Sequence, residues 1–237
     1  MIRTQALIAA VTLYTVSPVA ASQPDPNTST IPTVIHLVGK VGTSADPAGL
    51  FTVTVRDAAS APIGGARVQI AFGNCSDMSP ATQQLYPGVT LEQCSPPIVS
   101  AITDGAGVAR FSVLGSVLHR TATGSDSHEA CSSIRCSVGS DPPVTLGDVY
   151  VSAYDQDGVN GVRAHDVALW WCDYSSSQYD GSYHQRSDYV AASGCCFVGI
   201  DDFSALLSDY WAGGSQETAD RCDGTPPRWW PGRPTAT

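Results

Sequence analysis

The feature that most constrains this chain is a short unit that occurs twice in its C-terminal part. The first copy reads DQDGVNGVRAHD from Asp155 to Asp166 and continues VALWWCDY. The second copy opens at Asp188, reaches Asp202 and continues FSALLSDY, so the two tails align without a gap at an offset of 36 residues. An internal repeat of this kind indicates one supersecondary unit that is used twice.

The pattern within the first copy is typical of a calcium loop. Ca²⁺ prefers about six to eight hard oxygen ligands, and a loop of about 12 residues supplies them from positions 1, 3, 5, 7, 9 and 12. Asp155, Asp157 and Asp166 take positions 1, 3 and 12 of the first copy. Val159 and Gly161, at positions 5 and 7, can each offer a backbone carbonyl. These five residues are the candidate metal ligands of the first loop.

Apolar residues extend this loop into a helical pattern. Val162 occupies position 8, where an apolar residue pins the loop to its partner. Val167, Leu169 and Trp170 follow Asp166 at helical spacing. We therefore expect Asp166 to act both as a metal ligand and as the start of a helix.

The second copy departs from the pattern between its two ends. The segment from Asp188 to Asp202 spans 15 residues, and Val190, Ala192 and Cys195 stand where carboxylates are needed. We expect one good calcium site in the first loop, with Asp188 and Asp202 as the remaining ligands of a degenerate second site.

Two loop–helix units in tandem, with Asp rather than Glu at position 12 and no room for an entering helix, resemble the type I dockerin modules of extracellular bacterial proteins. The resemblance covers residues 148–213. It implies calcium as the bound metal, antiparallel packing of the two units, and a helix face that docks on a cohesin-like protein in a polysaccharide-degrading assembly or on a cell surface. Loop positions 10 and 11, often Ser or Thr in that family, are Ala164-His165 and Ile200-Asp201 here.

The N-terminus has the features of a secretory signal peptide. A short basic start precedes an apolar run from Ala6 to Tyr14, and Val19-Ala20-Ala21 stands before Ser22, which predicts cleavage after Ala21. The run is too short to cross a bilayer, and no other stretch approaches the length that a spanning helix needs. We therefore expect a secreted protein that does not span a membrane.

Residues 33–147 have the pattern of short β-strands. Apolar and polar residues alternate over short segments that are separated by turns containing Gly, Pro, Asp or Asn. The expected strands are 34–38, 51–55, 67–72, 99–103, 108–113 and, just beyond this region, 149–153. This arrangement predicts an antiparallel β-sandwich.

Two phrases of this region, VRDAASAPIGGARVQI (55–70) and TDGAGVARFSV (103–113), resemble the hairpins of bacterial Ig-like domains. In the second phrase, Asp104-Gly105 and Gly107 are expected to supply the positive-φ positions of a tight turn. The resemblance implies an Ig-like fold. It says little about function, because such sandwiches serve as spacers, adhesins and accessory modules alike.

The organisation that we predict is mainly β with a small α module. A signal peptide (1–21) and a polar linker (22–32) precede the Ig-like sandwich (33–147). The two-helix dockerin-like module (148–213) follows, and then a Pro- and Gly-rich tail (214–237). In the tail, Trp229-Trp230 either remain unpacked or stack on a sugar or a partner.

Eight cysteines, an even number in an exported chain, favour disulfides over metal sites. We expect pairing within each domain. The cysteines available for this are Cys75, Cys94, Cys131 and Cys136 in the sandwich, and Cys172, Cys195, Cys196 and Cys222 in the C-terminal part. The segments 74–97 and 118–143, which carry the sandwich cysteines, are long connections that serve either as disulfide-held excursions or as a ligand surface.

Charge and motifs narrow the possible functions. A net charge of −10 with a single lysine, Lys40, argues against nucleic-acid binding. The sequence has no GxSxG, HExxH or phosphate-binding glycine loop, and its five histidines lack ligand spacing. We predict a monomeric, non-catalytic, secreted calcium-binding protein whose dockerin-like module attaches it to a protein partner. The alternative is a structural or adhesive cell-surface protein in which the repeat only stabilises or anchors.

Overall fold

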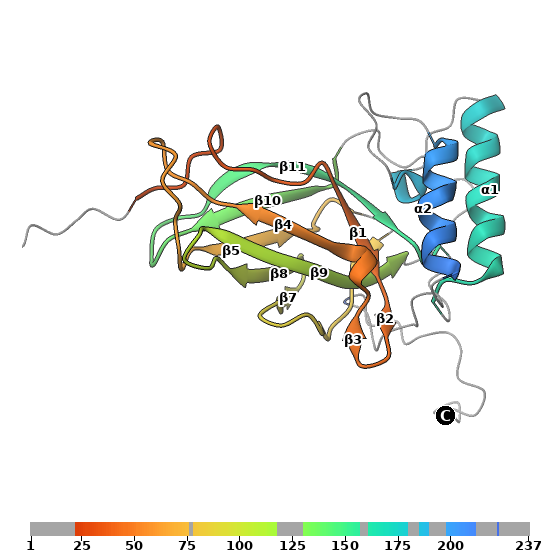
Figure 1. Cartoon of the computed structure of the whole chain (residues 1–237), viewed down its shortest axis with the longest axis horizontal. Helices are drawn as coiled ribbons and strands as arrows, with labels where there is room; N and C mark the ends of the chain where they lie inside the picture. Colours follow the sequence, from red (N-terminus) through yellow and green to blue (C-terminus); the bar gives the residue numbers. More distant parts are fainter. Residues whose placement is uncertain are drawn as a thin grey trace, which may run out of the picture.

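The computed structural model describes residues 22–75, 78–117, 130–156, 161–179, 185–189, 198–211 and 222. Within them the protein is mainly β, and two helices lie side by side at one end of the strands (Figure 1). The main sheet comprises β1 (Val34–Val38), β4 (Leu50–Thr54), β5 (Arg67–Ala71), β6 (Met78–Pro80), β7 (Thr90–Cys94), β8 (Pro97–Ile102), β9 (Val108–Val117), β10 (Ser132–Ser137) and β11 (Val144–Ala153). Strands β2 (Lys40–Val41) and β3 (Ser44–Ala45) form a separate hairpin, which is followed by a short 3₁₀ helix, η1 (Pro47–Gly49).

The sheet is mixed, which corrects the expectation of an antiparallel sandwich. The strand order is β4-β9-β1-β11-β10-β5-β8-β7, with β6 paired to β9. Strand β1 runs parallel to both of its neighbours, with Val34 opposite Tyr150 on β11 and Leu37 opposite Val113 on β9. Alternation of apolar residues identifies a strand but carries no information on the direction of its neighbours. The mainly β character of the chain is confirmed, whereas its Ig-like identity stays a prediction.

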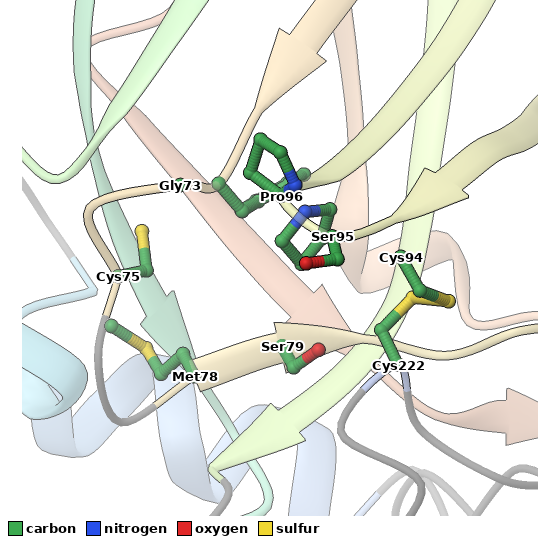
Figure 2. Close-up of a pocket in the computed structure, with 10 residues that line it drawn as sticks. Gly73, Cys75, Met78, Ser79, Cys94, Ser95, Pro96 and Cys222 are labelled. Atoms are coloured by element: carbon green, nitrogen blue, oxygen red, sulfur yellow. A yellow bond between two sulfur atoms is a disulfide. The ribbon is translucent and has the colours of Figure 1, made fainter.

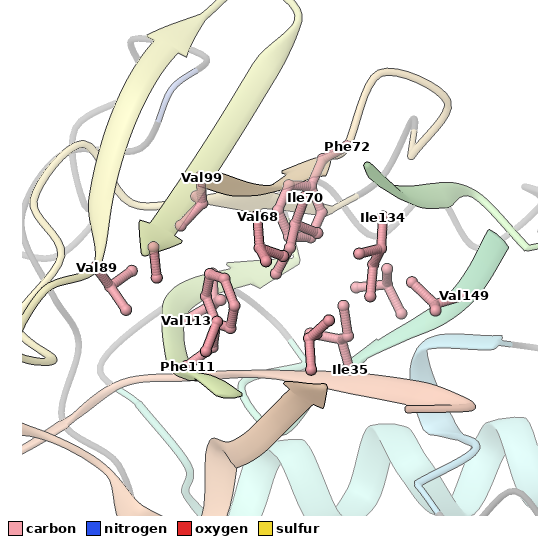
Figure 3. Close-up of a cluster of buried hydrophobic side chains, with 14 of the residues drawn as sticks. Ile35, Val68, Ile70, Phe72, Val89, Val99, Phe111, Val113, Ile134 and Val149 are labelled. Carbon is pink, nitrogen blue, oxygen red and sulfur yellow. The ribbon is translucent and has the colours of Figure 1, made fainter. Parts of the chain in front are cut away.

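The sheet surrounds one apolar core. Strand β5 illustrates its construction, because Val68 and Ile70 are fully buried whereas Arg67 points to solvent. Figure 3 shows the labelled residues of this core, which lie on β1, β5, β8, β9, β10 and β11 or next to β5 and β7 and point into the same interior. They are Ile35, Val68, Ile70, Phe72, Val89, Val99, Phe111, Val113, Ile134 and Val149. Strand β5 buries alternate residues, as its sequence pattern predicted, whereas β9 buries consecutive residues over most of its length.

The six expected strands are found, whereas the short hairpin β2–β3 and three strands of the main sheet were missed. The segment 34–38 coincides with β1, and the other five overlap β4, β5, β8, β9 and β11. The missed strands β6, β7 and β10 lie in the segments 74–97 and 118–143, where the sequence predicted long connections. Strand β7 is the edge of the sheet and buries few side chains, so its sequence, TLEQC, has no clear alternation.

One described disulfide agrees with the expected pairing within each domain, and the other joins the two groups of cysteines. Cys75 bonds to Cys131, and Cys94 bonds to Cys222. Cys75 follows β5 and Cys131 precedes β10, and these two strands are neighbours in the sheet, with Ala71 opposite Ser133. Disulfide partners are therefore set by which strand ends meet, and this depends on the sheet order rather than on spacing along the chain.

Two further cysteines lie in the described part of the chain and are free, Cys136 and Cys172. Cys136 is buried in the sheet core, and burial raises the pKa of its thiol to about 11. Its thiol is therefore unreactive at neutral pH. Cys172 is exposed on the first helix. Cys195 and Cys196 lie outside the described residues.

The C-terminal part contains α1 (Ala164–Tyr179), the 3₁₀ helix η2 (Gln185–Ser187) and α2 (Ile200–Trp211). The two α-helices begin 36 residues apart, which is the offset of the sequence repeat. A second apolar cluster fills the space around them and includes Val38 from β1 and Tyr154 from the end of β11. Strand β11 also runs across the expected boundary at residues 147 and 148. The helices thus pack directly on the end of the sheet.

None of the described helices is long and apolar enough to span a membrane. The expected signal peptide (1–21) lies outside the described residues, as does the expected tail (214–237) apart from Cys222.

Candidate calcium loops

The carboxylate of Asp166 closes the first loop. Its Oδ2 accepts the N–H of Arg163 at 2.7 Å, and its Oδ1 accepts the N–H of Gln156 at 2.7 Å. Asp166 is the third residue of α1, not its first, and it is fully buried. Its bond to Arg163 satisfies an N–H that the start of a helix leaves without a backbone partner, and its charge suits the positive end of the helix.

Asp202 closes the second loop in the same way. It is the third residue of α2 and is 2% exposed. Its Oδ2 accepts the N–H of Gly199 and its Oδ1 accepts the N–H of Tyr189, both at 2.7 Å. The two carboxylates therefore occupy equivalent places in two units, although the second loop is longer.

The first aspartate of each loop precedes the residue that donates the closing bond. Asp155 is 3% exposed and is followed by Gln156, whose N–H reaches Asp166. Asp188 is partly buried and is followed by Tyr189, whose N–H reaches Asp202. The structure thus brings together the two ends of each loop. In the first loop these ends are positions 1 and 12.

The middle of the first loop is described only in part. Gly161 is buried with a φ of +69°, a left-handed conformation that favours glycine. Val162 is 4% exposed and packs in the second apolar cluster, as expected for position 8. Asp157 and Val159 lie outside the described residues.

The two described carboxylates of the first loop are oxygen donors of the kind that calcium prefers. Asp155 and Asp166 offer hard carboxylate oxygens, and burying two such groups in one loop is costly unless a cation or hydrogen bonds compensate their charge. Among the described residues, no group of three or more His, Cys, Asp or Glu side chains could hold a metal ion. The described part of each loop supplies two expected carboxylates, and the third of the first loop, Asp157, lies outside it.

A buried polar network lies behind the two loops. Arg186 of η2 and Asp173 of α1 form an ion pair, and Ser187 donates to Asp173 Oδ2 at 2.6 Å. The amide of Gln156 lies 2.6 Å from the hydroxyl oxygen of Tyr189. Sequence reasoning did not identify these five residues as functional. Asp173 alone carried a signal, because the repeat aligns it with Asp209.

His36 joins this network to the sheet. Its Nδ1 lies 2.7 Å from Ser152 Oγ, and its ring lies 5.4 Å from the ring of Tyr154 and 6.1 Å from that of Tyr189. Burial lowers the pKa of His36 to about 4, so the imidazole is neutral at physiological pH. Burial also raises the pKa of Tyr189 well above its usual value, which keeps its hydroxyl protonated.

A separate cavity of about 430 Å³ lies beside the Cys94–Cys222 disulfide (Figure 2). Its lining is largely apolar and includes Phe72, Met78 and Pro96. Ser79 and Ser95 contribute the hydroxyl groups. The lining contains no acidic, basic or histidine side chain among the described residues, so this cavity offers no acid–base pair.

Comparison with protein-family models, with curated proteins and with solved structures finds no significant match to this chain.

Proposed function

We propose that this is a secreted, non-catalytic protein in which two paired loop–helix units, the first of which binds calcium, form an attachment module. The observation that carries the proposal is the common closure of the two loops. Asp166 and Asp202 each accept two backbone N–H groups, and all four bonds measure 2.7 Å. A loop closed in this way holds its first and last residues near each other, and a calcium loop takes ligands from both of these positions.

Calcium has a physical role in such a loop. Asp155 and Asp166 are both buried within the same loop, and like charges at short range repel each other. A bound Ca²⁺ offsets this repulsion, so the ion-free loop is expected to be looser. At a free calcium concentration of 100 times the Kd, linkage gives roughly 2.7 kcal/mol of added stability.

Secretion and attachment are supported by other features. The two disulfides are compatible with an extracellular protein, because such bonds persist in oxidising compartments. The helices also carry exposed apolar side chains, with Trp171 on α1 55% exposed and Ile200 on α2 62% exposed. Exposed aromatic residues are favoured in protein interfaces, so the outer face of α1 is the candidate contact surface for a partner.

A structural or adhesive surface protein is the second candidate, and one observation favours it. The module packs on the sheet through Val38 in the shared apolar cluster, and the tail that follows the module is joined to β7 by the Cys94–Cys222 disulfide. A module that is joined to its neighbour in this way is better suited to stabilise the protein than to act as a separable attachment domain.

Calorimetric titration of Ca²⁺ into chelator-treated protein tests the metal site. We expect heat from at least one site and a raised melting temperature, both lost in Asp155→Asn. The control is Asp57→Asn, which removes a carboxylate charge from an exposed turn of the sheet region, where Asp57 accepts the N–H groups of Ala59 and Ala61. Absence of heat and of any thermal shift in the unmodified protein would overturn the proposal.

Binding to purified cohesin modules separates the two candidates. Calcium-dependent retention that is lost in Trp171→Ala supports attachment, and Leu50→Ala serves as control because Leu50 is similarly exposed on the sheet. If the protein binds Ca²⁺ in the calorimetric titration but is not retained by cohesin modules, the stabilising role is supported instead.

A further inference from the structure

The side chain of Gln156 lies between the two loops. Its backbone N–H closes the first loop on Asp166, and its amide nitrogen, Nε2, lies 2.6 Å from the hydroxyl oxygen of Tyr189. Tyr189 is the residue whose N–H closes the second loop on Asp202. The two residues that close the loops therefore contact each other through their side chains.

The same amide reaches the segments that lead into both loops. Nε2 lies 2.6 Å from the carbonyl oxygen of Ala153, the last residue of β11, and 2.9 Å from that of Arg186 in η2. An amide nitrogen carries two hydrogens, so these acceptors and the tyrosine oxygen share them. The Tyr189 hydroxyl also lies 3.3 Å from the Ala153 oxygen and can donate to it.

Burial makes these contacts costly to break. Gln156 is fully buried and Tyr189 is 2% exposed. Solvent therefore does not readily replace a hydrogen bond that either side chain loses, and an unpaired buried polar group is destabilising. A movement of residue 156 that breaks its bond to Asp166 also pulls its side chain away from Tyr189.

We propose that Gln156 couples the two loops, so that opening of the first loop releases the second and an ion in the first loop orders both. The part that concerns calcium rests on the proposed function. The mechanical coupling does not, because it depends on hydrogen bonds within the chain. A second connection, from Asp173 on α1 to Arg186 and Ser187, also reaches the segment before the second loop, so the test must isolate the Gln156 route.

Residue-specific amide hydrogen exchange provides that test. Asp166→Asn replaces one accepting oxygen of the first loop by a donor, and the amide of Tyr189 reports on the second loop. We expect this substitution to speed exchange at Tyr189 by roughly fivefold, the factor that corresponds to one hydrogen bond of about 1 kcal/mol. In a Gln156→Ala background, Asp166→Asn should not speed exchange at Tyr189 any further. Alanine retains the backbone N–H that closes the first loop and removes the side-chain contacts of Gln156 with Tyr189, Ala153, Arg186 and Ser187.

A second background keeps the test decisive if Gln156→Ala does not fold. Tyr189→Phe removes the hydroxyl and retains the ring that packs 4.8 Å from Tyr154. Ser204→Ala, on the exposed side of α2, is the control and should leave the coupling intact. The proposal is wrong if Asp166→Asn speeds amide exchange at Tyr189 equally with and without the Gln156 side chain. It is also wrong if Asp166→Asn leaves this exchange unchanged in both proteins.

Addition of Ca²⁺ distinguishes the two proposals. In the unmodified protein it should slow exchange at Arg163 and at Tyr189, whereas in Gln156→Ala it should slow exchange at Arg163 alone. If Ca²⁺ slows neither amide while the substitutions still show coupling, the proposed function fails and the coupling stands. If Ca²⁺ slows exchange at Tyr189 equally in both proteins, coupling through Gln156 is wrong and calcium binding stands.

Discussion

Arg186 and Asp173 form a buried ion pair with two contacts. Nε of Arg186 lies 3.1 Å from Oδ2 of Asp173, Nη2 lies 3.3 Å from Oδ1, and the two side chains are 3% and 2% exposed. The pair fixes the segment before the second loop to α1. Because both charges are removed from water, each depends on the other for compensation.

Arg186→Met should lower the free energy of unfolding by about 3 to 5 kcal/mol, because it leaves the carboxylate of Asp173 buried without its cation. Urea denaturation followed by tryptophan fluorescence measures the loss, since Trp170 packs in the adjoining cluster. The double variant Arg186→Met, Asp173→Leu removes both charges and should recover most of the stability.

The matched control for this substitution is Arg110→Met. Arg110 pairs with Asp104 at 2.8 Å, but the two side chains are 53% and 41% exposed. Exposed ion pairs contribute at most about 1 kcal/mol, so this variant should be nearly as stable as the unmodified protein. If the two substitutions lower the free energy of unfolding by similar amounts, burial does not explain the contribution of the Arg186–Asp173 pair.

Acid should destabilise the protein through His36. The folded protein keeps this imidazole neutral down to its pKa of about 4, whereas the unfolded chain protonates it near 6.5. Between these values the unfolded state binds more protons, so stability falls as the pH falls through this window. The loss attributable to His36, which is only partly buried, should reach about 2 kcal/mol at pH 4.

Denaturation curves at several pH values check this dependence. His36→Gln retains a polar partner for Ser152 but cannot be protonated, so its stability should decline less between pH 7 and pH 4. Parallel declines in the two proteins would show that other groups, such as the loop carboxylates, account for the acid sensitivity.

The sequence predicted the parts of the fold that depend on local periodicity. Alternation identified β5, because Val68 and Ile70 are separated by an outward-facing residue and point into the core. It could not place β1 between β9 and β11, since that position depends on contacts between distant segments. The same dependence explains why the partner of Cys94 was predicted wrongly, because it lies 128 residues further along the chain.

The sequence predicted the candidate site, like the fold, only where a local pattern marks the residues. The repeat located Asp166 and Asp202, because a carboxylate before an apolar helical stretch is a local signal. Gln156 and Tyr189 were not identified, since an isolated Gln or Tyr has no pattern that marks it as a link between two loops. Their roles follow from a contact across 33 residues of chain, which the folded structure alone brings about.

Loss of the Cys94–Cys222 disulfide should loosen the attachment of the helices to the sheet. The bond joins the end of β7 to the segment after α2, with a sequence separation of 128. Restricting so long a loop in the unfolded chain contributes roughly 2 to 5 kcal/mol. The variant Cys94→Ser, Cys222→Ser should therefore unfold at a lower urea concentration.

The comparison for this bond is Cys75→Ser, Cys131→Ser, which opens a bond of separation 56 within the sheet region. Limited proteolysis should cut the helical part faster in the first double variant than in the second. Equal cleavage would mean that the shared apolar cluster holds the helices without help from the disulfide.

A final prediction concerns the turn between β8 and β9, where the sequence anticipated glycines with positive φ. Gly107 has a φ of +75°, and Asp104 Oδ1 accepts the N–H groups of Ala106 and Val108 around it. Gly105, also expected to have a positive φ, does not have one. A Cβ at residue 107 would lie 2.5 Å from the carbonyl oxygen of Val55, so alanine there meets rigid backbone as well as an unfavourable φ.

Gly42 supplies the matched control, because its φ is +62° but a Cβ added there would meet no neighbouring atom within 4 Å. Gly42→Ala should therefore lose about 1 kcal/mol for the left-handed backbone alone. Gly107→Ala should lose about 3 kcal/mol or more, because the backbone around Val55 must also shift. Urea denaturation of the two variants measures the difference, and equal losses would show that the turn relaxes around the added methyl group without cost.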